Sequence, residues 1–478
     1  MSRIQGTLAK RSGYCLRKGS IGSPADSFVN STVRFWPYSF RFFNSWFEYP
    51  GFVDFVLQKC GMFEFSGSTD LSLAMKLRWL KNNIKYWPKV EKQSREGIYG
   101  GKKRRLASIE RVAEERMLSE EELLERAECK TYIAEFDRMK QLDLHQKSRS
   151  KWAVDGDENS AYFHHVINSN ISTNRLNELM INGVWVTNPL AIKESLYEFF
   201  LHQFTEPMPV RPELVCPNLA MISDSEASML EAPFLVEEIK AAIWECDGDR
   251  APGPDGFNFK FIKKCWSGLR ADFVNLFNSF YEEGSLKKCC MSSFIALIPK
   301  VKDPVSPANY RPISLIGVVN KVISKVLVNR LKGVLGKLIS EQQSAFLAGR
   351  NIMDGPLVLN EVLSWAKKTK RKGLYFKVDI NKAYDSVNWE FLNSIMAQMN
   401  FPSRWRTWIM ATLHSARASV LVNGSPTREL ECSRGLRQGD PLSPFLFIIV
   451  MEALTGIMKK ATSMGLFNGI KISNEGDY

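Results

Sequence analysis

The sequence predicts an α+β fold in which a mostly helical arm precedes a region of mixed strands and helices. The first observation is a charged stretch from about residue 70 to 150, where apolar positions recur three and four residues apart among many acid–base pairs. The second is that segments of alternating polarity at 294–315, 374–380 and 419–424 stand among amphipathic helical patterns. Strands and helices are therefore both expected in the second half of the chain.

Composition and charge narrow the class of protein. The chain has 478 residues, which allows about two to four domains. Hydrophobic residues make up 45% and aromatic residues 12%, so the composition is not that of a disordered chain. Lys and Arg number 64 against 51 Asp and Glu, and the net charge of +13 favours a polyanionic partner such as nucleic acid. A basic solvated surface is the alternative explanation.

Cysteine usage and hydropathy indicate an intracellular protein of the nucleus or cytoplasm, with no zinc and no membrane span. The nine cysteines form no CxxC pair, and no Cys/His cluster, His164-His165 included, has zinc spacing. The apolar run 444–458 is too short to cross a bilayer. Residues 1–25 are basic and lack acids, which weakly resembles a transit peptide or reflects a chance terminus. The basic run 101–105 is either a nuclear import patch or a solvated helix end.

The first half of the chain is expected to be largely helical. Aromatic residues crowd 35–59, which either end a compact unit or pack against one. The stretch 105–128 predicts one long exposed helix or a pair of helices. Turn residues interrupt the pattern at 152–168, and 181–189 predicts a short hairpin followed by a helix. A Pro/Gly loop at 247–261 separates two further helices.

The second half carries the predicted strands. Residues 294–315 predict a strand, a basic turn and a second strand, and 318–340 predict an amphipathic helix. In 374–380 the alternation predicts a strand that turns Leu374, Phe376, Val378 and Ile380 to a core and Tyr375, Lys377 and Asp379 to a cleft.

After that strand, a helix is expected from about Trp389 and a strand at 419–424. A buried helix should follow, with Ser443 as its cap and Pro444 in its first turn. The final residues predict two short strands.

Five motifs occur in one order and spacing: APGPDGF (251–257), IPK…NYRPISL (298–315), QSAFLAGRNIMD (343–354), VDINKAYDSVNW (378–389) and GLRQGDPLSPFLF (435–447). Together they resemble the reverse transcriptase region of non-LTR (LINE-type) retrotransposons, especially the plant versions, from about residue 35 onward. The resemblance implies the fingers and a partial palm of a right-hand polymerase. It divides the chain into a leader (1–34), a remnant of an endonuclease join (35–65), a charged helical arm (66–175), a helical region leading into the fingers (176–290), fingers (291–372) and a partial palm (373–478).

The resemblance assigns a metal site. Polymerases join nucleotides with two Mg²⁺ ions, which require oxygen ligands. By this resemblance Asp379 is the first metal carboxylate and Ile380 offers its backbone carbonyl. Asp385 is expected to be a helix-start or turn residue. Tyr384 matches the aromatic residue that excludes a ribose 2′-hydroxyl, although a packed core tyrosine is the alternative.

Other positions are assigned to the nucleotide and to the nucleic acid. Gln438 matches a glutamine beside the incoming nucleotide, and Gly439 would let the backbone approach a ligand. Lys300 and Arg311 match residues that reach the triphosphate, and Lys302 competes with Lys300 for that role. A solvated basic hairpin is the alternative for all three. Lys302, Arg350 and Lys321 are assigned to template or primer, and a role in holding the fingers is the alternative for Arg350. Gly253 and Gly256 are expected only to shape a loop.

The resemblance implies an aspartate pair in an ADD hairpin downstream of 465–476, and no ADD occurs in this sequence. The expectation is therefore a reverse transcriptase domain that is catalytically incomplete, with an RNA template, a DNA primer and deoxynucleotides as partners. The alternative is an inactive nucleic-acid-binding remnant. No endonuclease is expected, because residues 1–34 contain no histidine and no SDH motif.

Overall fold

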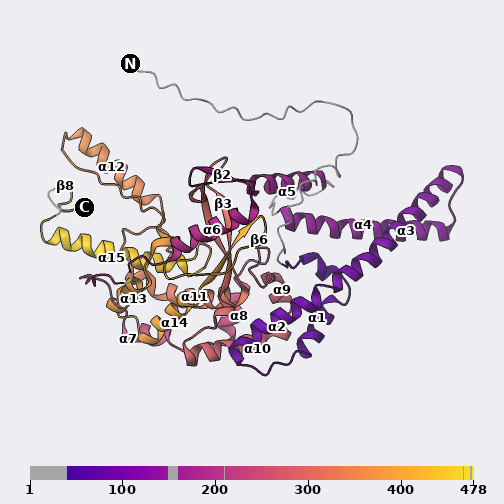
Figure 1. The fold of residues 1–478 in the computed structure, drawn as a ribbon, viewed down its shortest axis with the longest axis horizontal. Coiled ribbons are helices and arrows are strands. Elements are labelled where there is room, and N and C mark those ends of the chain that lie inside the picture. The colour runs from indigo at the N-terminus through magenta and orange to yellow at the C-terminus, as the bar shows by residue number, and fades with distance from the viewer. Residues whose placement is uncertain (1–39, 149–159, 209, 467, 474–475, 478) are drawn as a thin grey trace, which may run out of the picture.

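The computed structural model describes residues 40–478 except 149–159, 209, 467, 474–475 and 478. The leader and the proposed transit peptide lie outside the described residues. Helices dominate the first half, and a five-stranded sheet lies in the second, so the predicted α+β class is confirmed (Figure 1).

The aromatic segment near the N-terminus packs into the main core. It forms a short 3₁₀ turn, η1 (Asn44–Glu48), followed by α1 (Phe52–Gly61) and α2 (Thr69–Ile84). The Phe42 ring lies 4.9 Å from that of Phe261 in α9 (Phe259–Lys264), and α2 packs along α10 (Trp266–Glu283). The prediction that this segment packs on a compact unit is therefore confirmed.

The charged stretch forms a pair of helices rather than one. Helices α3 (Trp87–Glu115) and α4 (Glu120–Ser148) project together from the body as a hairpin (Figure 1). Arg105 pairs with Glu125, and Arg126 pairs with Glu110, across the two helices. Helix α5 (Ser160–Asn174) packs on α4. The projecting part starts at α3 rather than at residue 66, because α2 contributes its apolar face to the core.

The predicted hairpin and helix at 181–189 are confirmed. Strands β1 (Leu179–Ile181) and β2 (Val184–Val186) are joined by Asn182-Gly183, both with positive φ, as tight hairpins require. Helix α6 (Pro189–Phe204) follows, and the Asn188 side chain caps it by accepting hydrogen bonds from two backbone N–H groups. Two shorter helices, α7 (Asp224–Leu230) and α8 (Val236–Trp244), come next.

The main sheet joins segments far apart in the sequence. Strands β3 (Ser292–Pro299) and β4 (Tyr310–Ile316) are antiparallel, and β5 (Arg417–Val422) runs parallel to β3. The short strands β6 (Ser425–Pro426) and β7 (Leu430–Glu431) both pair with β5. Side chains of α6, Leu196 and Phe200 among them, share a second core with residues of β3 and β5. This packing fixes α6 against the sheet.

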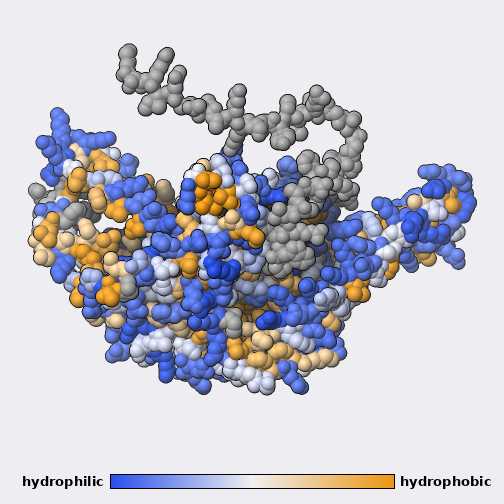
Figure 2. Space-filling view, in the orientation of Figure 1, coloured by the Kyte–Doolittle hydropathy of each residue, from blue (hydrophilic) through white to orange (hydrophobic). Residues whose placement is uncertain are grey.

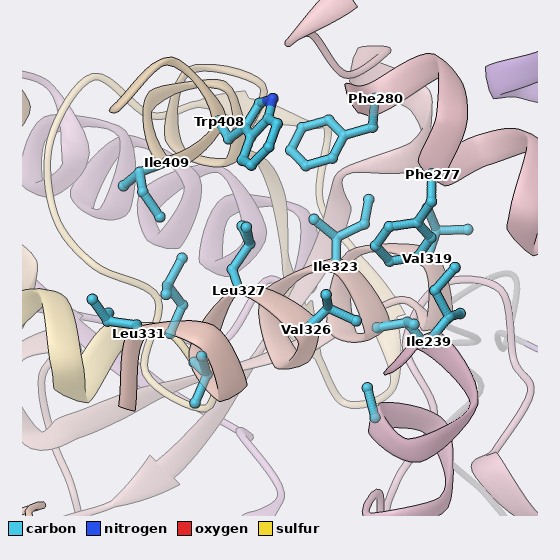
Figure 3. Packing of buried hydrophobic residues seen from close by; sticks show 14 of the residues in the cluster. Ile239, Phe277, Phe280, Val319, Ile323, Val326, Leu327, Leu331, Trp408 and Ile409 are labelled. Carbon is cyan, nitrogen blue, oxygen red and sulfur yellow. The ribbon is translucent and has the colours of Figure 1, made fainter. Parts of the chain in front are cut away.

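Helix α11 (Val318–Leu338) forms the centre of the main core, as its amphipathic pattern predicts. Figure 3 shows its apolar side chains meeting Phe277 and Phe280 of α10 and Trp408 of α14 (Ser403–His414). Two further helices, α13 (Trp389–Gln398) and α15 (Ser443–Ser463), pack against each other. Helix α15 starts at Ser443 with Leu442 as its cap, so the prediction that Ser443 is the cap is off by one residue, while Pro444 lies in the first turn as predicted.

The predicted strand at 374–380 is wrong. Residues 371–380 adopt no regular secondary structure and are exposed, with Leu374 at 90% and Phe376 at 79% exposure. Alternation makes a segment compatible with a strand, but a strand also needs a neighbour, and no described strand pairs with this one. The adjacent helix α12 (Asp354–Lys368) buries none of its residues. Figure 2 shows apolar surface on this side of the molecule. The last strands, β8 (Lys471–Ser473) and β9 (Gly476–Asp477), pair with each other.

Candidate nucleotide and nucleic-acid site

Two of the predicted motifs meet through their backbones. The 3₁₀ turn η4 (Tyr384–Ser386) lies against the loop 433–442. Leu436 N donates to Tyr384 O at 2.7 Å, and Gly435 N donates to Val387 O at 2.8 Å. Gly435 has φ 87°, and a Cβ there would lie 2.7 Å from Asp385 O. Glycine is required here both for its conformation and for the close approach.

The same loop is attached to the sheet. Ser314 N of β4 donates to Gln438 O at 2.7 Å. Gly439 has φ 108°, and a Cβ at this position would lie 2.9 Å from Ser314 O. The backbone that Gly439 allows to approach is therefore that of β4. The turn 384–386, the loop 433–442 and the β3–β4 hairpin form one continuous assembly.

A side-chain network lies inside this assembly. Asp385 is 4% exposed, and its carboxylate accepts hydrogen bonds from Gln438 Nε2 at 3.1 Å and from Gln203 Nε2 at 2.8 Å. Lys382 Nζ donates to Gln203 Oε1 at 2.8 Å. Burial raises the pKa of Asp385, while the hydrogen bond from Gln438 and the nearby charge of Lys382 oppose the rise. Asp385 belongs to a turn, as predicted, but its buried role as an acceptor was not anticipated.

The sugar-selecting candidate belongs to the same turn as Asp385, and the metal candidates precede that turn in the sequence. Tyr384 is half-buried and stacks on Phe447 of α15 with ring centroids 4.8 Å apart; burial raises its pKa. Asp379 and Ile380 lie in the exposed segment before the turn. Among the described residues no group of three or more His, Cys, Asp and Glu side chains could hold a metal ion. One carboxylate and one carbonyl do not complete the six oxygen ligands that Mg²⁺ prefers.

The basic candidates occupy the β3–β4 hairpin. Lys300, Lys302 and Arg311 are all exposed. Lys300 Nζ donates to Ala308 O at 3.1 Å, which holds it near the base of the turn. Within the described ranges none of the three forms an ion pair, so their charges face solvent. This hairpin is joined to Gln438 through Ser314.

The structure places Arg350 outside this assembly and Lys321 at its edge, where Lys321 interacts electrostatically with Asp440 of the loop 433–442. The Arg350 guanidinium donates to the carbonyls of Ile339, Ser340 and Gln343, which closes the loop after α11. Those bonds favour the holding role over template contact. Lys321 Nζ lies 5.1 Å from the centre of the Phe259 ring, and burial lowers its pKa.

The two glycines of the loop 251–257 allow close approaches of the backbone and so shape the loop, as expected. A Cβ at Gly253 would lie 2.5 Å from backbone atoms of Ile316 and Gly317, and one at Gly256 would lie 2.5 Å from Phe40. Asp255 accepts from Val318 N at 2.5 Å and so caps α11. The capping role of this aspartate was not anticipated.

Comparison with known proteins identifies a domain in the second half of the chain. The model for reverse transcriptase (RNA-dependent DNA polymerase) matches residues 298–472. A retrovirus-related Pol polyprotein of the type-1 retrotransposable element R2 from Nasonia vitripennis is 30% identical over 261 residues, covering 52% of this chain and 25% of that protein. Residues 298–472 are a reverse transcriptase domain of the non-LTR retrotransposon type.

Two further relatives support this assignment of the reverse transcriptase domain. The transposon TX1 uncharacterized 149 kDa protein of Xenopus laevis is 27% identical over 318 residues, which cover 66% of this chain and 24% of that protein. The RNA-directed DNA polymerase from mobile element jockey of Drosophila melanogaster is 25% identical over 275 residues, which cover 56% and 30%. The chain thus spans less than a third of the length of these relatives.

Sequence reasoning missed two residues of the Asp385 network. Gln203 lies outside the matched region and outside all five motifs, so its sequence carried no signal. Lys382 lies inside VDINKAYDSVNW and has φ 54°, a left-handed conformation that is uncommon for residues other than glycine.

No helix in the described part of the chain is long and apolar enough to span a membrane.

Proposed function

We propose that the reverse transcriptase domain serves RNA-directed DNA synthesis, with an RNA template, a DNA primer and deoxynucleotides as its ligands. Lys300 and Arg311 would contact the triphosphate, and Tyr384 would exclude a 2′-hydroxyl. Gln438 would lie beside the incoming nucleotide. Lys302 would meet the phosphates of template or primer. Lys321 and Arg350 are assigned to them less directly, because Lys321 is half-buried beside the Phe259 ring and Arg350 bonds to three backbone carbonyls.

One observation supports this proposal above the others. Three segments that are far apart in the sequence, the β3–β4 hairpin, the turn 384–386 and the loop 433–442, are tied together by short backbone hydrogen bonds. Each of them carries residues assigned to the nucleotide. A binding site made from fixed elements loses little entropy when its ligand binds.

Divalent metal ions are general to reverse transcriptases. We assign Asp379 and the Ile380 carbonyl as two oxygen donors of a Mg²⁺ site. Two donors fall short of a full set. The chemistry that such a metal supplies, activation of the primer hydroxyl and binding of the leaving phosphates, therefore also needs ligands other than these two.

A second candidate function is nucleic-acid binding without synthesis. The exposed position of 371–380 favours it, because no neighbouring strand among the described residues holds Asp379 in place. The exposed basic hairpin and the net charge of +13 serve binding equally well in either case.

Nucleotide-dependent binding separates the two candidates. The chain would be mixed with a fluorescent, dideoxy-terminated DNA primer annealed to an RNA template in Mg²⁺ buffer, and the dissociation rate measured by anisotropy after a heparin challenge. The proposal predicts slower dissociation with the next complementary deoxynucleotide than with a mismatched one. Arg311→Ala should abolish this difference, while Arg270→Ala, an exposed arginine on α10, should leave it intact. Equal rates with both nucleotides would support binding without synthesis.

A further inference from the structure

A cleft of about 480 Å³ opens beside the Asp385 network, on the side facing α6. One wall is a single face of α6, where Ser195, Phe199 and His202 follow one another at helical spacing. The lining also includes the turn of the β1–β2 hairpin, together with Lys382 and Arg434, which both contact α6. None of the five sequence motifs accounts for this cleft as a whole, because most of its lining comes from residues before 205.

The cleft contains cations that are held but not neutralised. Lys382 Nζ donates to the side-chain oxygen of Gln203, and Arg434 Nε donates to the backbone oxygen of the same residue at 2.9 Å. Gln203 therefore orients both. A lysine ammonium has three donors, and an arginine keeps its terminal fork when only Nε is used, so each retains capacity for phosphate oxygens. Among the described residues neither side chain forms an ion pair.

The charged groups around Lys382 do not neutralise it, so an anion can bind there. Lys300 and Arg434 are close enough to Lys382 to add to the positive charge around it. Asp385 is the acid that interacts with Lys382, but its carboxylate already accepts hydrogen bonds from two amides. Glu198 also lines the cleft, on the α6 wall. Lys382 also has a left-handed backbone conformation, which is energetically unfavourable for a residue other than glycine. Such a conformation persists only where the surrounding structure imposes it.

We propose that this cleft binds one nucleotide unit of a single-stranded nucleic acid, with its phosphate held by Lys382 and Arg434. The base would lie between the α6 wall and the β1–β2 turn, where apolar Ile181 and Phe199 stand beside polar Asn182 and Glu198. This inference rests on the proposed function, since it adds a path for the unpaired strand next to the nucleotide site. The volume is suited to one nucleotide rather than to a duplex.

Binding of single-stranded 12-mers tests the proposal. Fluorescent oligo(U) RNA and oligo(dT) DNA would be titrated with the whole chain over a series of salt concentrations, with the two arms distinguishing RNA from DNA. Lys382→Ala with Arg434→Ala should lower the slope of log K against log salt by about 0.7, because the two side chains hold one phosphate and each single-strand phosphate contact contributes about 0.7. The matched pair Lys89→Ala with Lys92→Ala on the distant arm should not change the slope.

A second variant and a crosslink guard against loss of folding. Ser195→Trp leaves every charge in place but fills the cleft, so it should weaken single-strand binding at least several-fold while thermal unfolding stays unchanged. Photocrosslinking with 4-thiouridine RNA should label peptides containing Phe199 or Asn182. A folded Ser195→Trp variant with wild-type affinity, or crosslinks confined to other surfaces, would overturn the proposal. Either result would leave the nucleotide-dependent binding to template–primer untouched, so failure of the cleft and failure of the proposed function are distinguishable.

Discussion

Gln438 and Asp385, which lie 53 residues apart, are joined by a 3.1 Å hydrogen bond from Nε2 to Oδ1. The carboxylate thereby fixes the orientation of the glutamine assigned to the incoming nucleotide. Because Gln203 donates to the other oxygen, the same aspartate links α6 to the loop 433–442.

Removing the Asp385 carboxylate should destabilise the protein. Asp385→Ala leaves the side-chain amides of Gln203 and Gln438 without their acceptor, at a cost of about 1–3 kcal/mol for the buried amide of Gln203 and less for that of the half-buried Gln438. Urea unfolding followed by circular dichroism would measure the change. Glu341→Ala, at an exposed loop acid, should change stability by less than about 0.5 kcal/mol. Equal stabilities of Asp385→Ala and wild type would contradict the network.

The stability contribution of Asp385 should depend on pH with a defined sign. Burial raises its pKa in the folded state above the ordinary 3.8, so the folded protein holds a proton more tightly than the unfolded chain. Stability from this group is greatest at low pH and falls as the pH rises from about 4 through the raised pKa. The free energy of unfolding of wild type minus that of Asp385→Asn should therefore decrease as the pH rises through this interval. An increase over the same interval would show that the folded-state pKa is lowered instead.

Gly439 should not tolerate a side chain. Its φ of 108° and the 2.9 Å approach to Ser314 O predict that Gly439→Ala strains the loop and loosens it from β4, at about 1–3 kcal/mol. Gly336→Ala is the matched control, because Gly336 lies exposed in α11, where an added Cβ would have nothing within 4 Å. That change should stabilise the helix by about 0.5–1 kcal/mol. Thermal unfolding of both variants should show shifts of opposite direction.

Duplex binding should be strongly salt-dependent. Lys300→Ala with Lys302→Ala removes two exposed charges from the β3–β4 hairpin. Affinity for an RNA–DNA duplex should fall steeply between about 50 and 200 mM salt, and the double variant should have a shallower slope, because fewer counterions are released. Filter binding at several salt concentrations measures both. Identical slopes for the double variant and wild type would remove this hairpin from the interface.

Sequence patterns predicted most of the helices and strands, because the residues within each of these segments favour the conformation that the segment adopts. Helix α11 buries the apolar face that its periodicity shows, and Asn182-Gly183 adopts the turn that its residue types favour. Segment 374–380 has the pattern of a strand but no described strand beside it, and pairing is a property of the fold rather than of the segment.

The site was predictable only in part. The motifs pointed to Gln438, Gly439 and Tyr384, which do lie in one assembly. They gave no sign of Gln203, because its role depends on α6 packing against the sheet. Arg350 is the opposite case. It lies in a motif and was assigned to template or primer, but its guanidinium bonds to three backbone carbonyls. Contacts between distant segments cannot be read from local spacing.

Primer extension tests the central proposal, RNA-directed DNA synthesis by this domain, most directly. The chain would be fused to the part of the jockey polymerase that lies C-terminal to its matching region, because the two donors assigned to Mg²⁺ here fall short of a full set. With an RNA template, a DNA primer and Mg²⁺, the fusion is expected to extend the primer, and Asp379→Asn should abolish extension while leaving thermal unfolding unchanged, because it removes a metal-binding charge at nearly constant shape. A folded fusion that binds template–primer but never extends it, or one that extends equally well with Asp379→Asn, would contradict the account.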